Sequence, residues 1–281
     1  MARSVPIEMA LKLHNIFTEK KWTENASHDA VFERLCELSG CFDKKHMDFL
    51  LELTSRYTWL TFNDYQSQLL ELMKDLCEQQ LSNIDRLFIF PIMKPSDEES
   101  TKSGNAVMYM LKGIKGFLSE YQDIQFQQIE KFDELVNEDL KLGDSDYLIL
   151  VDDYIGSGNT LRSTLTELNS NKSINGKFSV LTVMIQESTK TKLEESEISV
   201  FSGFTASRGI SDYYEGEELM EKIKLMEEIE RKIPKVKRFQ FGYEKSEALA
   251  TLIRTPNNTF PIFWKNCSNR GNTFLAPFSR F

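Results

Sequence analysis

The sequence has few histidines, and its cysteines are dispersed. All three histidines, His14, His28 and His46, lie in the first fifth of the 281 residues. This placement argues against a histidine-based catalytic triad and against a His-rich metal site. The four cysteines show no metal-ligand spacing, and we interpret them as reduced thiols that pack in the interior.

Long apolar runs are also missing. The longest, such as Leu148–Val151, fall far short of the roughly 20 residues that a helix needs to cross a bilayer. Residues 1–6 lack the apolar segment of a secretory signal. We therefore expect a cytoplasmic protein that has no contact with a membrane.

Basic residues are too few to balance the acidic ones. Lys and Arg number 34 and Asp and Glu number 43, which gives a formal net charge of -9. Binding along nucleic acid needs clustered Lys and Arg, so we predict no direct nucleic-acid contact. The apolar and charged fractions, 41% and 27%, are typical of a globular protein.

Hydrophobic spacing predicts three regions. Residues 1–82 have helical periodicity and contain no glycine after Gly40, which predicts a helical region. Residues 83–235 alternate short apolar runs with amphipathic stretches, which predicts a mostly parallel sheet flanked by helices. Residues 236–281 place aromatic side chains among Asn, Pro and Gly, which predicts an irregular segment packed on the core. The expected fold class is therefore α/β with two additional segments.

The α/β region contains recognisable strand and helix patterns. The expected strands are residues 87–91, 147–151, 178–185 and 198–204. The expected helices are residues 106–118, 160–168, 187–195 and 216–232.

One strand–loop–helix segment combines acids with small residues. Asp152 and Asp153 follow the apolar run 147–151, and a loop with Gly156 and Gly158 comes next. In parallel sheets, ligands bind beyond the carboxyl ends of the strands. Glycines and a helix N-terminus let backbone N–H groups approach an anion, so the loop is suited to a phosphate monoester.

The two acids need a different partner from the phosphate, because like charges repel. Carboxylates accept hydrogen bonds from vicinal hydroxyls such as those of a ribose. The segment therefore predicts a site for a ribose and its 5′-phosphate. The alternative is an ordinary strand–turn–helix in which Asp152 and Asp153 are solvated.

This segment resembles the phosphoribosyl pyrophosphate (PRPP) motif of type I phosphoribosyltransferases. The resemblance implies that Asp152 and Asp153 hold the ribose hydroxyls as catalytic residues. It also implies a phosphate-binding loop made of Ile155, Gly156, Ser157, Gly158, Asn159 and Thr160.

A second stretch, Lys102-Ser103-Gly104-Asn105, resembles the pyrophosphate loop of the same family. The resemblance implies that Lys102 takes part in catalysis, that Ser103 and Gly104 bind substrate, and that Mg²⁺ binds with the pyrophosphate. The alternative is a surface loop in which Ser103 caps a helix.

The chain as a whole resembles a phosphoribosyltransferase-like family of bacterial conflict (antiphage defence) systems. The resemblance rests on residues 241–249 and 255–264, together with the Asp-Asp-Tyr-Ile-Gly-Ser-Gly loop. It implies a defence operon, a protein partner from that operon, and action on a small phosphoribosyl or nucleotide ligand.

The aromatic C-terminal segment has two interpretations. It could lie over the carboxyl ends of the strands as a hood, with Phe263 or Trp264 stacked on a base. Alternatively, these aromatic side chains close the core.

Three functions remain open from the sequence. The first is an enzyme that uses PRPP with Mg²⁺, and the second is a non-catalytic module that senses PRPP or a nucleotide for a partner. The third is an S-adenosylmethionine methyltransferase, because residues 153–161 also resemble a Gly-rich cofactor loop. The absence of any Pro-Pro pair and the acidic balance disfavour the third.

Overall fold

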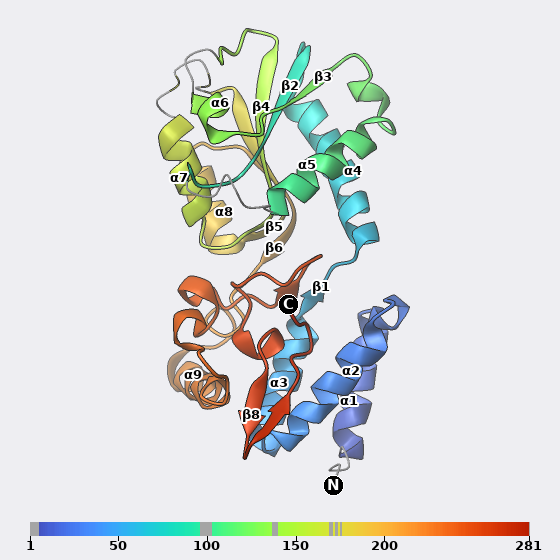
Figure 1. The fold of residues 1–281 in the computed structure, drawn as a ribbon, viewed down its shortest axis with the longest axis vertical. Coiled ribbons are helices and arrows are strands. Elements are labelled where there is room, and N and C mark those ends of the chain that lie inside the picture. The colour runs from blue at the N-terminus through green and yellow to red at the C-terminus, as the bar shows by residue number, and fades with distance from the viewer. Residues whose placement is uncertain are drawn as a thin grey trace. The chain divides into compact units, whose positions relative to one another are not determined.

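The computed structural model describes residues 6–95, 103–136, 140–168, 171, 174 and 176–280. The chain forms two compact units (Figure 1). One combines Met1–Thr61 with Ser207–Phe281, and the other is Phe62–Ala206. We refer to them as the split unit and the sheet unit.

The sheet unit contains a five-stranded parallel sheet. Its strands are β2 (Arg86–Pro91), β3 (Gln125–Gln128), β4 (Asp146–Ile155), β5 (Phe178–Gln186) and β6 (Val200–Ala206). Their order is β3-β2-β4-β5-β6, and every neighbouring pair is parallel. The central strands are continuous apolar runs because both faces of the sheet are covered. The expected parallel α/β fold is confirmed.

Helices cover both faces of this sheet (Figure 1). One side has α4 (Phe62–Gln80) and α5 (Ser103–Lys115), and the other has α6 (Phe132–Val136), α7 (Asn159–Leu168) and α8 (Glu187–Glu195). A short 3-10 turn, η4 (Ser119–Tyr121), follows α5. On the side of α6, α7 and α8, the helices bury a core with members such as Phe90, Leu150 and Leu161.

The strand order reverses between β2 and β4. The chain leaves β2 toward β3 on one side and leaves β4 toward β5 on the other. In open parallel sheets, such a reversal separates the loops that follow two adjacent strands and creates a crevice at their carboxyl ends. In this unit, the crevice position lies where β2 ends at Pro91 and β4 ends at Ile155.

The split unit is mostly helical. Its helices are α1 (Ile7–Glu19), α2 (His28–Glu37), α3 (Lys44–Arg56) and α9 (Gly216–Glu230). Its short strands are β1 (Thr58–Trp59), parallel to β7 (Ala250–Thr251), and the antiparallel pair β8 (Cys267–Asn269) and β9 (Asn272–Phe274). Its 3-10 turns are η1 (Trp22–Glu24), η2 (Leu38–Gly40), η6 (Lys237–Phe239), η7 (Tyr243–Lys245) and η8 (Pro261–Phe263).

One apolar core joins the two segments of the split unit. Leu13, Phe17 and Tyr57 from the N-terminal segment share it with Phe260 and Phe263 from the C-terminal segment. The aromatic side chains expected to form a hood are therefore buried inside this unit. Phe263 is fully buried, and the Trp264 indole, 3% exposed, donates a hydrogen bond from Nε1 to the Thr259 carbonyl.

This division differs from the expected boundaries at 82 and 235. Helix α4 packs against β5, β6 and α5, whereas α9 packs against α3. Helical periodicity identifies a helix and its apolar face, but it does not identify the element that the face covers. Helix α4, expected in the helical region, therefore belongs to the sheet unit. Helix α9, expected in the α/β region, belongs to the split unit.

In the part of the chain that the structure describes, no helix is both long enough and apolar enough to cross a membrane.

Candidate functional site

Strand β4 extends further than the sequence predicts. It includes Asp152 and Asp153 and ends only at Ile155, because β5 continues alongside it. Asp152 lies opposite Thr182, and Ile155 lies opposite Ile185. Ile155, expected in the phosphate loop, is therefore a strand residue whose side chain packs in the core.

The loop after β4 is short and tightly packed. It comprises Gly156, Ser157 and Gly158 before α7 begins. Gly158 has a φ of 74°, and a Cβ atom there would lie 2.8 Å from Cγ2 of Thr189. The Thr189 hydroxyl donates a hydrogen bond of 2.6 Å to the Gly156 carbonyl. Glycine at 158 is thus required by both the backbone conformation and the space.

The first turn of α7 presents polar side chains at this loop. Asn159 and Thr160 are half-buried residues of that turn. The Asn159 carboxamide oxygen accepts a hydrogen bond from the Arg162 guanidinium, and the Arg162 amide donates to the Gly158 carbonyl at 2.8 Å. Backbone N–H groups at a helix start favour an anion.

The two carboxylates make separate hydrogen bonds. Oδ1 of Asp152 accepts from the Ser103 hydroxyl at 2.7 Å and from the amide of Asp153 at 2.9 Å. Oδ2 of Asp153 accepts from the hydroxyl of Tyr65 at 3.3 Å. Within the described residues, neither carboxylate forms an ion pair with Lys or Arg.

Burial changes the acidity of this pair. Desolvation raises the pKa of Asp152 well above its ordinary value, and the charge of Asp153 raises it further. Desolvation also raises the pKa of Asp153, while the hydroxyls of Ser103 and Tyr65 oppose that effect. Two adjacent acids with raised pKa values are suited to a ligand that donates hydrogen bonds or brings a cation, because either would stabilise their charged forms.

The structure brings the two predicted loops together. Ser103 is the first residue of α5, which follows β2, and its hydroxyl contacts the acid pair of β4. A Cβ atom on Gly104 would lie 2.7 Å from the Val151 carbonyl oxygen and 3.0 Å from Cβ of Pro91. Gly104 therefore lets α5 approach the sheet closely. Lys102 lies outside the described residues.

Two contacts of this site were not predicted from the sequence. Tyr65 comes from α4, and its sequence neighbourhood contains no indication of a site. Thr189 lies in α8, directly after the carboxyl end of β5, so the expected strand 178–185 followed by a helix over 187–195 already places it at the ligand-binding edge of a parallel sheet.

The acid pair fits a metal that arrives with its ligand. Among the described ranges, no group of three or more His, Cys, Asp or Glu side chains could hold a metal ion. Mg²⁺ commonly binds through one or two carboxylates together with substrate phosphates and water. Asp152 and Asp153 supply two carboxylates without a paired cation, so they fit Mg²⁺ that is bound with a diphosphate.

An all-parallel sheet with an acid pair and a glycine loop at the strand reversal defines a phosphoribosyltransferase-like α/β protein. The family model described as PRTase-CE matches residues 20–280, nearly the whole chain. The chain therefore belongs to the PRTase-CE family. Comparison with curated protein sequences gave no match.

Several solved structures are similar at low sequence identity. A purine phosphoribosyltransferase from Pyrococcus horikoshii is 16% identical, with a TM-score of 0.31 over 54% of this chain and 87% of that one. A hypothetical protein from Neisseria gonorrhoeae with bound ppGpp is 15% identical, with a TM-score of 0.36 over 61% and 96%. A hypoxanthine-guanine phosphoribosyltransferase from Schistosoma mansoni in complex with IMP is 12% identical, with a TM-score of 0.33 over 51% and 62%.

Proposed function

We propose that the sheet unit binds PRPP or a nucleotide at the β4–α7 segment and that the protein is a phosphoribosyltransferase. The observation that supports this most is the acid pair of half-buried Asp152 and buried Asp153 beside the Gly156–Gly158 loop. That pair lies at the strand reversal, where parallel sheets bind ligands.

In this proposal, the two carboxylates accept hydrogen bonds from the ribose hydroxyls. Gly156, Ser157 and Gly158 offer backbone N–H groups to the 5′-phosphate, and Asn159 and Thr160 extend the same surface into α7. Ile155 contributes only its backbone, because its side chain is in the core. Lys102, Ser103 and Gly104 are assigned to the diphosphate side of the ligand.

The proposed reaction is a displacement at C1 of the ribose. A nitrogen nucleophile forms a C1–N bond and releases its N–H proton to water, and the C1–O bond to pyrophosphate breaks with its electron pair leaving on the pyrophosphate. The transition state resembles an oxocarbenium ion, so catalysis depends on positioning and on charge stabilisation. Mg²⁺ bound with the pyrophosphate supplies charge neutralisation of the leaving group.

Replacing both acids tests the site. For Asp152→Asn with Asp153→Asn, we expect PRPP binding in the presence of Mg²⁺ to weaken by at least about tenfold, measured by calorimetry. We expect the variant to fold at least as well as the parent, because burial disfavours the two charges.

Asp144→Asn is the matched control. The Asp144 side chain is fully exposed in the turn before β4, at the opposite end of the strand from the acid pair. PRPP affinity should be unchanged in this control. Equal affinity in the parent and in the double variant would contradict the site assignment.

A non-catalytic sensing module is the second candidate. The split unit favours it, because this unit has a core of its own and offers a separate surface for a partner. Turnover distinguishes the two candidates. Release of pyrophosphate from PRPP with a panel of nucleobases supports the enzyme, whereas PRPP binding without release supports the module. S-adenosylmethionine, included in the same calorimetric series, should not bind.

The biological setting that we propose is a bacterial antiphage defence system in the cytoplasm, with a protein partner from the same operon. This proposal follows from the family resemblance of residues 241–249 and 255–264. Phage plating on cells that express the operon is the test. Protection should disappear in the Asp152→Asn, Asp153→Asn variant, and equal plating with and without the operon would contradict the proposal.

A further inference from the structure

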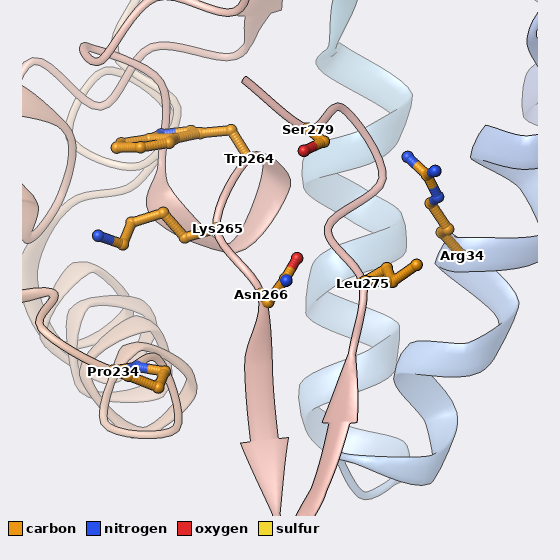
Figure 2. Close-up of a pocket in the computed structure, with 7 residues that line it drawn as sticks. All are labelled: Arg34, Pro234, Trp264, Lys265, Asn266, Leu275 and Ser279. Atoms are coloured by element: carbon orange, nitrogen blue, oxygen red, sulfur yellow. The ribbon is translucent and has the colours of Figure 1, made fainter. Parts of the chain in front are cut away.

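The split unit contains a pocket of about 500 Å³ (Figure 2). Residues from three separate parts of the chain line it: helix α2, the segment after α9, and the C-terminal segment around β8 and β9. The lining residues are Arg34, Pro234, Trp264, Lys265, Asn266, Leu275 and Ser279. All of them belong to the split unit, so this pocket is distinct from the site at β4.

The charge of this pocket is opposite to that of the chain. The chain has a net charge of -9, yet the lining includes two cations, Arg34 and Lys265, and no acid. Within the described residues, neither cation forms an ion pair with a carboxylate. Unpaired cations in a concave site favour an anionic ligand.

Neutral groups position both cations. The Arg34 guanidinium donates a long hydrogen bond of 3.4 Å to the Ala276 carbonyl. The ammonium of Lys265 lies 5.4 Å from the ring centroids of both Phe239 and Trp264. Aromatic faces and a carbonyl restrict these side chains without cancelling their charge, so each cation remains able to bind an anion.

The rest of the lining is mixed in polarity. Leu275 is 48% exposed, and it and Pro234 provide apolar surface. Oδ1 of Asn266 accepts a hydrogen bond from the Ala276 amide at 3.0 Å, which leaves the amide nitrogen as the donor. Figure 2 shows Trp264 and Lys265 on one side, Arg34 and Leu275 on the other, and Asn266 between them.

We propose that this pocket binds a small organic anion, in which a phosphate or carboxylate group is joined to an apolar body. The acidic group would contact Arg34 or Lys265, and the apolar body would lie against Leu275 and Pro234. The volume is within the range of small-molecule sites, about 300–1,000 Å³. The proposal does not depend on the function proposed for the sheet unit.

The test uses 8-anilinonaphthalene-1-sulfonate, an anion with an apolar aromatic body, and follows its fluorescence on titration of the full chain. For Arg34→Gln with Lys265→Gln, the Kd should rise by at least about tenfold. The matched control is Arg270→Gln, since Arg270 is an exposed cation in the turn between β8 and β9 and does not line the pocket. In the control, the Kd should stay within about twofold of the parent.

Competition with unlabelled anions identifies which acidic group the pocket binds. Displacement of the probe by AMP indicates an organic phosphate, and displacement by octanoate indicates a carboxylate. Both titrations are repeated with Asp152→Asn and Asp153→Asn, so that binding of AMP at the β4 site cannot imitate the result. Equal probe affinity in the parent and in the double cation variant, with both folded by circular dichroism, would overturn the proposal. Failure of both competitors at millimolar concentration would overturn it too.

Discussion

The Glu230 carboxyl group is fully buried on α9, yet it has no cationic partner to neutralise it in the described part of the split unit. Its two oxygens accept hydrogen bonds from the Phe241 amide at 3.0 and 3.2 Å. Burial raises the pKa of this carboxyl to about 8, against an ordinary value of 4.5. At neutral pH, the group is therefore mostly protonated in the folded protein.

This pKa predicts a loss of stability at rising pH. Between pH 4.5 and about 8, the folded state binds a proton at Glu230 that the unfolded state has released. The free energy of unfolding therefore falls as the pH rises through this window, by up to about 1.4 kcal/mol per pH unit from this group. In Glu230→Gln, that part of the pH dependence should disappear, as measured by urea unfolding at a series of pH values.

Glu218→Gln is the control, because Glu218 is exposed in the first turn of the same helix. It should keep the pH dependence of the parent. An unchanged pH dependence in Glu230→Gln would contradict the explanation.

At the same scale, the sequence indicates candidate residues of the site more readily than it indicates their contacts. Asp152, Asp153 and the two loop glycines are candidates because of their order along the chain, and the structure places them in one continuous β4–α7 segment. Ile155 was assigned to the loop, since nothing in its own neighbourhood shows that β5 continues beside it. Tyr65 could not be predicted, because its contact with Asp153 joins residues far apart in the sequence.

Helix α5 shows how one element depends on the absence of a single side chain. Gly104 faces the Val151 carbonyl and Pro91, whereas a Cβ atom on Gly113, on the same helix, would meet nothing within 4 Å. The close approach of α5 places Ser103 within hydrogen-bond distance of Asp152. The geometry of the site therefore depends on the packing of this helix against β2 and β4.

The two glycines should respond to alanine in opposite directions. Gly104→Ala should lower the free energy of unfolding by about 1–3 kcal/mol, because the added methyl group forces α5 away from the sheet. Gly113→Ala should raise it by about 0.5–1 kcal/mol, since alanine favours the helix and the space is open. Urea unfolding of both variants measures the difference. Equal changes in the free energy of unfolding would contradict the explanation that a side chain at position 104 forces α5 away from the sheet.

Among the elements, strands with continuous apolar runs were predicted well. The structure has β2, β4, β5 and β6 within a few residues of the expected ranges, and α8 at the expected residues. Strand β3 was missed because its sequence, Gln-Phe-Gln-Gln, has no apolar run, and its position at the sheet edge requires none. The two-residue strands β1 and β7 are too short to show a period.

At the scale of the whole molecule, the sheet unit is inserted into the split unit. The chain passes from one unit to the other after Thr61 and returns after Ala206. Composition along the chain could not reveal this. One segment of the split unit has helical periodicity and the other places aromatic residues among Asn, Pro and Gly, and the two lie far apart in the sequence. Only their shared core shows that they form one unit.

An aromatic cluster joins the two segments of the split unit. The ring of Phe278 stacks on Tyr57 with 4.6 Å between centroids and contacts Trp22 and Trp59 edge-on. The Thr255 hydroxyl also donates a hydrogen bond to the Phe278 carbonyl at 2.9 Å. A residue three positions from the C-terminus therefore completes a core that begins in α1.

Phe278→Ala should destabilise the split unit by about 3–5 kcal/mol, because it leaves a cavity in this cluster. Amide hydrogen exchange should accelerate in residues 6–61 and 207–280 while protection in β2, β4 and β5 is retained, since the sheet unit has a core of its own. Phe117→Ala, an exposed position after α5, is the control and should change neither pattern. Uniform acceleration across both units would contradict the prediction.

The insertion also sets an order of events on the ribosome. All residues of the sheet unit emerge consecutively, so this unit can fold while translation continues. Helices α1 to α3 emerge before the sheet unit, yet part of the core that buries their apolar faces comes from residues 207–280, which are translated after it. Until residues 207–280 have been made, these helices expose part of their hydrophobic surface, which is the kind of surface that chaperones bind.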